Sequence, residues 1–379
     1  MKWIERKLEK QFSEEMRKGK VTVLYGGRRV GKTSLIERYL SKQKHLKCFS
    51  GTGDDADLRN ILCSESLSTI NIAFKGYDVV FIDEAQRIPK IGQALKLLID
   101  SNPEMKIIAS GSSSFELANR IGEPLTGRQK TYSLFPLSID ELVSNFGAMP
   151  VIQNLNQYLI YGSYPEILTL DNQLAKKQYL TELRNAYLFK DILELENIRN
   201  SAKLVDLLKL IAFQIGNEVS LNELSKSLGI AKQTVERYLD LLEKTFTIIR
   251  IRAYSTNQRK EISKSSRYYF WDNGVRNSII QNFNDPSTRM DMGMLWENFC
   301  FVERLKKQHY QNIFSNTYFW RSYDQQEVDM IEERDGSLFA FEFKWNPNKK
   351  AKAPKGFAKL YPDAKFECIS PANFLEFLN

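Results

Sequence analysis

Short apolar runs alternate with amphipathic helical segments in the first part of the chain. The apolar run at residues 21–25 precedes residues 33–40, where apolar positions recur with helical spacing. Two further apolar runs, at residues 79–82 and 105–114, suit strands that are buried on both faces of a parallel sheet. The pattern predicts an α/β domain with a parallel sheet.

Helical periodicity then dominates from residue 152 to about residue 213. Residues 218–254 have the order helix, glycine turn, helix and strand, with Ser220 as an N-cap and Gly229 in the turn. This order predicts a winged helix. An amphipathic helix at residues 293–308 and an antiparallel hairpin after it predict a small α/β domain at the end of the chain.

Composition narrows the class of protein. The 379 residues are too many for one compact core, and a net charge of +8 favours an anionic partner. The four cysteines and two histidines lack metal-ligand or disulfide spacing, which indicates a reducing compartment. No signal-peptide pattern occurs, and no apolar run approaches the roughly 18 residues that cross a bilayer. We therefore expect a cytoplasmic protein without a membrane partner.

A glycine-rich stretch between the first strand and its helix matches G-x-x-x-x-G-K-[ST] without a gap. In such a loop, successive backbone N–H groups and the helix N-terminus point at the β-phosphate. We expect Lys32 to bridge the β- and γ-phosphates and Thr33 to bind Mg²⁺. The predicted nucleotide-binding residues of the loop are Gly26, Gly27, Arg28, Arg29, Val30, Gly31, Lys32, Thr33 and Ser34.

An acid pair ends the apolar run at residues 79–82. Asp83 is expected to support Mg²⁺, and Glu84 to orient an attacking water or accept its proton. A tandem acid pair is typical of hydrolytic ATPases and distinguishes them from P-loop kinases.

Two further residues have alternative interpretations. Ser110, or Ser112 beside it, contacts the γ-phosphate or the nucleophilic water, or else caps a helix over residues 115–120. Arg128 is either an arginine finger, within its own chain or from a neighbouring subunit of a homo-oligomer, or a solvated loop residue.

The motifs together resemble the prokaryotic AAA-like ATPases of the archaeal-ATPase group, in which the ATPase domain precedes a C-terminal region of unknown function. The resemblance implies ATP, with adenine rather than guanine, and Mg²⁺ as cofactors. It covers nearly the whole chain and rests on the order of GGRRVGKTSL, FIDEAQRI, SGSSSFEL, LTGRQKTYSLFPLSIDEL, YGSYPEIL, YLFKDILEL, YYFWDNGVRN and GMLWENFCFVERL.

The C-terminal hairpin has the carboxylate spacing of PD-(D/E)xK nucleases. Asp329 lies on one arm, and Glu342 and Lys344 share a face of the other. With Glu297 from the preceding helix, these groups would form a second metal site beside a scissile phosphate. The resemblance implies a restriction-endonuclease-like fold here, without establishing cleavage. The alternative is an exposed hairpin face with cross-strand salt bridges.

Basic residues favour double-stranded DNA as a partner of the winged helix and of the last segment, whereas protein docking or dimerisation is the alternative for the winged helix. The basic and polar positions of the recognition helix are Lys232, Gln233, Arg237 and Lys244. The lysines of the last segment are Lys349, Lys350, Lys352, Lys355 and Lys359.

We therefore predict a Mg²⁺-dependent ATPase whose nucleotide state controls C-terminal parts that act on DNA. The alternative is a signalling or scaffold ATPase whose C-terminal region binds a macromolecule without cutting it. The expected divisions are an AAA-like ATPase domain (1–148), a helical connector (149–215), a winged helix (216–290) and a nuclease-like domain (291–379).

Overall fold

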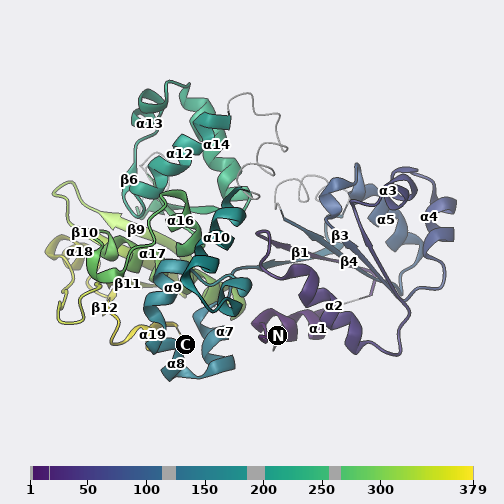
Figure 1. Cartoon of the computed structure of the whole chain (residues 1–379), viewed down its shortest axis with the longest axis horizontal. Helices are drawn as coiled ribbons and strands as arrows, with labels where there is room; N and C mark the ends of the chain where they lie inside the picture. The colour runs from purple at the N-terminus through teal and green to yellow at the C-terminus, as the bar shows by residue number, and fades with distance from the viewer. Residues whose placement is uncertain (1–2, 17, 113–124, 186–200, 256–265, 379) are drawn as a thin grey trace. The chain divides into compact units, whose positions relative to one another are not determined.

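The computed structural model describes residues 3–16, 18–112, 125–185, 201–255 and 266–378. These residues form two compact units, each with its own sheet (Figure 1). The N-terminal unit consists of Glu5–Pro136 and Lys244–Phe246. The C-terminal unit consists of Met1–Ile4, Leu137–Glu243 and Thr247–Asn379.

Five parallel strands in the order β2-β3-β4-β1-β5 form the sheet of the N-terminal unit. The predicted parallel α/β sheet is therefore confirmed. All six residues of β1 and the first four of β3 are buried, which explains their continuous apolar sequences. The elements are α1 (Lys7–Glu15), β1 (Val21–Gly26), α2 (Lys32–Lys42), β2 (Cys48–Thr52), α3 (Ala56–Cys63), α4 (Leu67–Phe74), β3 (Val79–Asp83), η1 (Ala85–Arg87), α5 (Ile91–Ser101), β4 (Lys106–Gly111) and β5 (Gln129–Leu134).

The N-terminal unit ends earlier than the expected boundary at residue 148. Helix α7 (Ile139–Phe146) belongs to the C-terminal unit, where Ile139 and Leu142 lie in the same apolar cluster as Trp296. The backbone N–H of Ile139 also donates to the buried carboxylate of Glu303 at 2.6 Å. These long-range contacts leave no signal in the local sequence pattern.

A seven-stranded sheet in the order β12-β11-β10-β9-β7-β8-β6 forms the centre of the C-terminal unit. Its strands are β6 (Glu218–Val219), β7 (Ile248–Ala253), β8 (Ser266–Phe270), β9 (Asn316–Arg321), β10 (Glu327–Arg334), β11 (Ser337–Phe343) and β12 (Lys365–Ile369). Its remaining elements are α8 (Ala148–Gln153), α9 (Leu155–Tyr161), η2 (Pro165–Thr169), α10 (Gln173–Arg184), α12 (Ser201–Phe213), α13 (Leu221–Leu228), α14 (Lys232–Lys244), α16 (Asn273–Ile279), η4 (Pro286–Thr288), α17 (Met292–Tyr310), α18 (Lys355–Leu360) and α19 (Phe374–Leu378).

This single sheet does not match the domain boundary expected at residue 290, because strands from both sides of that boundary belong to it. Strand β7 pairs in parallel with β9, with Ala253 opposite Phe319. The strands predicted for the winged helix and for the nuclease-like domain therefore belong to one continuous sheet. Helix α17 packs on both parts, because Phe301 stacks on Tyr269 of β8 with ring centroids 4.2 Å apart. The two predicted domains therefore share one core.

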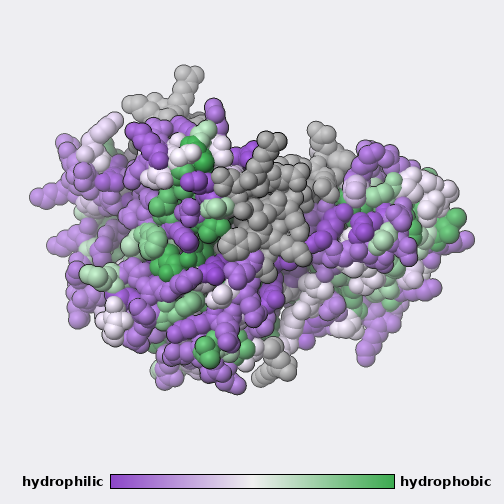
Figure 2. Space-filling view, turned by 45° about the horizontal axis from the view of Figure 1, so that its top comes forward, coloured by the Kyte–Doolittle hydropathy of each residue, from purple (hydrophilic) through white to green (hydrophobic). Residues whose placement is uncertain are grey.

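The surface in Figure 2 is mainly hydrophilic, with hydrophobic side chains gathered in smaller patches. Among the described residues, no helix combines the length and the apolar character needed to cross a bilayer.

Candidate functional site

The loop between β1 and α2 has the geometry that its glycines predict. A Cβ atom at Gly26 would lie 2.2 Å from the carbonyl oxygen of Leu134 on the neighbouring strand, so only glycine fits there. Gly31 has a φ of 98° at the N-cap of α2, in the left-handed region that glycine adopts without strain. The backbone therefore curls directly into the first turn of α2.

Lys32 is the first residue of α2 and is buried. Its ammonium group donates to the carbonyl oxygens of Gly26 and Gly27 at 2.8 and 2.9 Å. The positive charge is thus held over the loop, in the place where a bound phosphate group would need it.

Asp83 lies at the end of the sheet where the carboxyl ends of three parallel strands are close together. The hydroxyl of Thr33 donates to one Asp83 oxygen at 2.7 Å, and the hydroxyl of Ser110 donates to the other. Strand β4, which carries Ser110, lies between β1 and β3, with Leu24 opposite Ser110. The helix that Ser110 or Ser112 was expected to cap lies outside the described residues.

Glu84 directly follows this strand end. Its φ of 47° lies in the left-handed region, so the chain turns sharply after Asp83. Its carboxylate accepts a hydrogen bond from the amide of Gln86 and one from the hydroxyl of Ser112 at 3.4 Å. Gln86 and Ser112 are themselves hydrogen-bonded at 3.2 Å, so they orient the Glu84 side chain together.

Two positioning residues were missed by sequence reasoning. Buried Arg6 donates to the carbonyl oxygens of Val30 and Phe135, at 2.7 and 2.6 Å, and so ties the phosphate loop to the end of β5. A lone arginine in an N-terminal helical segment carries no signal for this contact. Gln86 had a weak signal, since it follows the acid pair by two residues in the quoted FIDEAQRI stretch.

Strand register separates Arg128 from the phosphate loop of its own chain, which favours the alternative of a loop residue over an arginine finger in cis. Arg128 precedes β5, whose first residue pairs with Val21, whereas Gly26 at the phosphate loop pairs with Leu134. Five residues of strand separate the two ends, about 17 Å. Arg128 instead forms an exposed ion pair with Asp100. A role in the site of a neighbouring subunit stays a prediction.

The donor groups at the N-terminal site suit a magnesium nucleotide. A hydroxyl and a carboxylate oxygen meet beside Lys32 and the curled backbone, and hard oxygen donors are those that Mg²⁺ prefers. Mg²⁺ commonly takes one or two protein ligands and completes its shell with phosphate oxygens and water. Thr33 and Asp83 thus fit the cation as a pair.

A second cluster of acidic groups lies in the C-terminal unit, where α17, β10 and β11 contribute Glu297, Asp329 and Glu342. Asp329 lies at an irregularity in the pairing of β9 with β10, a feature that re-aims a strand side chain. Its carboxylate accepts the backbone N–H of Phe343 at 2.9 Å. Lys344 forms an ion pair with Glu342. The structure therefore brings Asp329, Glu342 and Lys344 of the hairpin motif together, with Glu297 of the preceding helix as a charged neighbour.

Burial and mutual repulsion dominate the electrostatics of this cluster. Burial, together with the neighbouring charge of Asp329, raises the pKa of Glu297 to about 8. Burial and the charge of Glu342 raise the pKa of Asp329 to about 6. The second oxygen of Glu342 is buried and has no hydrogen-bond partner in the described part of the chain.

Arg267 supplies a buried positive charge that the sequence did not indicate. Its guanidinium lies 3.6 Å from the Glu297 carboxylate and 2.8 Å from that of Glu327. It also lies over the ring of Phe319, 4.4 Å from the centroid. Among the described residues, no group of three or more His, Cys, Asp or Glu side chains is arranged to hold a metal ion. The predicted use of Glu297 as a third carboxylate ligand therefore does not fit this arrangement, in which Glu297 faces Arg267 and Tyr269.

The fold and the N-terminal site define a P-loop protein of the ATPase type. Comparison with known families agrees, because residues 18–143 match the model described as an AAA domain. Residues 152–286 and 292–372 match two domains of unknown function, DUF8612 and DUF4143. The chain thus combines an AAA-like domain with a C-terminal region that matches domains of unknown function.

Relatives extend over most of the chain. It is 25% identical over 93% of its length to the uncharacterized protein MJ1544 of Methanocaldococcus jannaschii, and covers 81% of that protein. It is 26% identical over 86% of its length to the uncharacterized protein Rv2008c of Mycobacterium tuberculosis, and covers 70% of it.

Likeness to solved structures is distant. The AMPPCP-bound replication initiator DnaA from Aquifex aeolicus is 15% identical with a TM-score of 0.31, over 62% of this chain and 86% of that one. A signal transduction ATPase with numerous domains, PH0952 from Pyrococcus horikoshii, is 14% identical with a TM-score of 0.33, over 81% and 46% of the two chains. Neither likeness bears on the function of this chain.

Proposed function

We propose that the N-terminal unit binds ATP with Mg²⁺ and hydrolyses the bond between its β- and γ-phosphates. The observation that carries this proposal is the 2.7 Å contact between Thr33 and Asp83, which joins the phosphate loop to an acid residue 50 positions later. Two motifs with separate roles in phosphoryl transfer thus meet at the carboxyl ends of the strands of one sheet.

Each side chain has a role that follows from its position. When ATP binds, the Lys32 ammonium group donates to phosphate oxygens instead of to the two loop carbonyls. Thr33 and Asp83 together hold the cation. When bound, Mg²⁺ neutralises charge on the phosphates. Glu84 orients the attacking water and accepts its proton, while Gln86 and Ser112 hold the Glu84 carboxylate in place. Ser110 keeps Asp83 oriented.

ATP turnover of the full chain tests this assignment. Lys32→Ala is expected to abolish nucleotide binding, and Glu84→Gln to preserve binding while reducing turnover by at least about 100-fold. Lys44→Ala is the matched control, because Lys44 is an exposed lysine beyond the end of α2. Turnover that survives both site substitutions would refute the proposal.

We further propose that the C-terminal unit acts on nucleic acid at Asp329, Glu342 and Lys344. The observation that favours this second function is the buried, unpartnered oxygen of Glu342 close to Asp329, since such an atom is satisfied by an added ligand. Asp329 and Glu342 would hold a divalent cation as a pair, and Lys344 would stabilise charge at a phosphate.

The helix-turn-helix region offers less support for binding double-stranded DNA. The order α12, β6, α13, α14, β7, β8 is that of a winged helix. However, exposed Lys232 and Arg237 of α14 are balanced by exposed Glu236 and Asp240. A balanced face suits a protein partner as well as a duplex.

Cleavage assays with Mg²⁺ or Mn²⁺ distinguish a nuclease from a macromolecule-binding region. Asp329→Ala and Lys344→Ala are each expected to remove cleavage, whereas Glu367→Ala, at an exposed position of β12, leaves it unchanged. Cleavage that resists both site substitutions, or that is absent from the wild type, would favour the signalling or scaffold function.

A further inference from the structure

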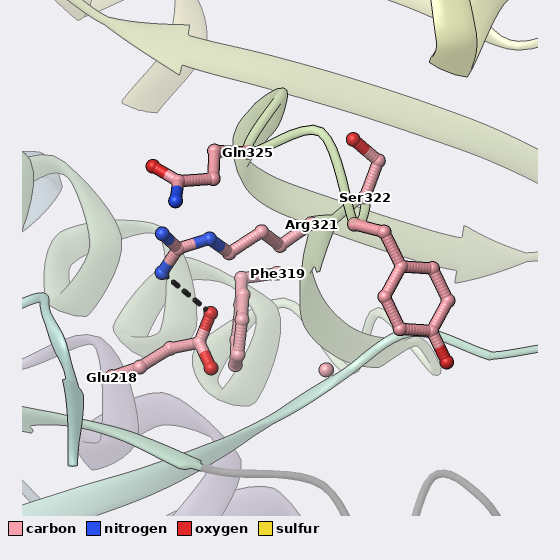
Figure 3. A pocket seen from close by; sticks show the side chains of 7 residues that line it. Glu218, Phe319, Arg321, Ser322 and Gln325 are labelled. Carbon is pink, nitrogen blue, oxygen red and sulfur yellow. Dashed lines mark hydrogen bonds and ion pairs between the residues drawn. The ribbon is translucent and has the colours of Figure 1, made fainter.

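A pocket of about 390 Å³ opens in the C-terminal unit beside β6, β7 and β9 (Figure 3). This volume is within the range of small-ligand sites. Phe319, whose side chain is buried, lies behind one side of the pocket. Another side is polar, and Figure 3 shows the side chains of Gln325, Arg321 and Glu218 gathered on one side of the Phe319 ring. Arg321 and Glu218 form an ion pair of 2.9 Å.

Tyr323 also lines the pocket and is fully exposed, at 102% of its reference surface. It is carried by a tight turn in which the N–H of Gln325 donates to the carbonyl of Ser322 at 3.1 Å and the N–H of Ser322 donates to that of Gln326 at 2.9 Å. The turn therefore presents an aromatic ring to solvent at the rim of the pocket.

These walls match the chemistry of a nucleobase. A base has two flat faces that stack on aromatic rings and an edge that carries both donors and acceptors. The guanidinium, amide and carboxylate at the pocket supply complementary groups. Bases in a duplex are stacked and paired, so only an unpaired base can enter a pocket of this kind.

Positive charge for a backbone lies next to the same turn. The N–H of Gly356, in α18, donates to the side chain of Gln326 at 2.8 Å, which places the start of α18 beside the turn. The exposed lysines of this segment include Lys352, Lys355 and Lys359. An exposed aromatic ring next to a basic segment is a combination that binds single-stranded nucleic acid.

The pocket is also connected to the acidic cluster. Arg321 contacts Glu327 at 3.1 Å, Glu327 contacts Arg267 at 2.8 Å, and Arg267 contacts Glu297 at 3.6 Å. This chain of alternating charges leads from the pocket wall to the proposed nucleic-acid site.

We propose that this pocket binds one unpaired base of single-stranded nucleic acid, an inference that rests on the proposed action of the C-terminal unit on nucleic acid. The base stacks on Tyr323, its polar edge faces Arg321 and Gln325, and the lysines of the α18 segment contact the adjacent phosphates.

Fluorescence anisotropy with the full chain and a labelled oligothymidylate tests the pocket. Tyr323→Ala is expected to weaken binding about tenfold, the effect of losing one stacked base, and Tyr323→Phe to retain the affinity. Phe314→Ala is the matched control, because Phe314 is 89% exposed and precedes β9 at the end opposite to Arg321. A duplex of the same length is expected to bind more weakly than the single strand.

The outcomes separate the pocket from the function on which it rests. If nucleic acid binds but Tyr323→Ala has no effect, or if the duplex binds better, the pocket assignment is wrong while action on nucleic acid stands. If neither form binds the wild type, the nucleic-acid function fails and the pocket assignment with it. Capture of a peptide instead, with the same dependence on Tyr323, would overturn the nucleobase as occupant.

Discussion

Asp83 illustrates how single residues are oriented at the ATPase site. Each of its carboxylate oxygens accepts a hydrogen bond, one from Thr33 and one from Ser110. Thr33 is part of the recognised loop motif, whereas Ser110 comes from a strand that lies between the two motif strands. In the proposed ATPase, Ser110 is therefore a positioning residue, which would act on the nucleotide through Asp83.

Replacing Ser110 by alanine tests this positioning role. A hydrogen bond to a charged group contributes about 2 kcal/mol, so we expect Ser110→Ala to lower kcat for ATP hydrolysis about tenfold or more. Lys32 and the loop are unaffected, so KM is expected to change little. Steady-state ATPase kinetics measure both constants.

The matched control for this test is Ser41→Ala, because Ser41 is an exposed serine on α2. An unchanged kcat in Ser110→Ala would show that the remaining hydrogen bonds to Asp83, from Thr33 and from the backbone N–H of Glu84, suffice to orient it.

At the scale of elements, α17 organises the C-terminal unit. It packs on the sheet through Trp296 and Phe301 and contributes Glu297 to the acidic cluster. Its N-cap residue, Asp291, forms ion pairs with Arg276 and Arg289, which lie outside the helix. Asp291 therefore anchors the start of the longest described helix.

The anchoring by Asp291 predicts a specific pH dependence of stability. Burial alone would raise the pKa of Asp291, but hydrogen bonds from Arg289 and Arg276 lower it from 3.8 to about 2. A carboxyl group whose pKa is lower in the folded than in the unfolded protein stabilises the fold fully at pH values above the unfolded-state pKa. This stabilisation is lost as the pH falls through the folded-state pKa. We expect Asp291→Asn to cost about 2 kcal/mol at pH 7, and about half as much at pH 3.

Urea unfolding of both proteins at the two pH values measures this difference. Asp324→Asn, in the exposed turn beside Tyr323, is the control and is expected to show little cost at either pH. A cost of Asp291→Asn that does not change with pH would show that the ion pairs are not its cause.

At the scale of the whole molecule, the described residues form two compact units, where the sequence pattern suggested more. Residues from 216 to 290 and from 291 to 379 contribute strands to the same sheet. A cut between them would separate β9 from β7 and α17 from Tyr269.

This shared core predicts the behaviour of fragments. Residues 137–379 are expected to unfold cooperatively on heating, whereas residues 291–379 alone are expected to show no cooperative transition, because they expose an unpaired strand and an apolar helix face. Circular dichroism during thermal unfolding distinguishes the two. A sharp transition in the shorter fragment would instead establish an independent C-terminal domain.

The sequence by itself determined the features whose residues are close together along the chain. The phosphate loop, the acid pair after β3, the capped helix at Ser220 and the β10–β11 hairpin are all local patterns, and each lies where its pattern predicts. The parallel sheet could also be predicted, because burial on both faces leaves continuous apolar runs.

Only the tertiary structure decided which distant residues meet. Strand register placed Arg128 at the end of the sheet away from the phosphate loop, and long-range hydrogen bonds brought Arg6 to that loop. The pairing of β7 with β9 joined two expected domains, and the buried charge of Arg267 became visible only where β8 lies beside α17. Such contacts depend on the order of strands in a sheet, which neighbouring residues do not encode.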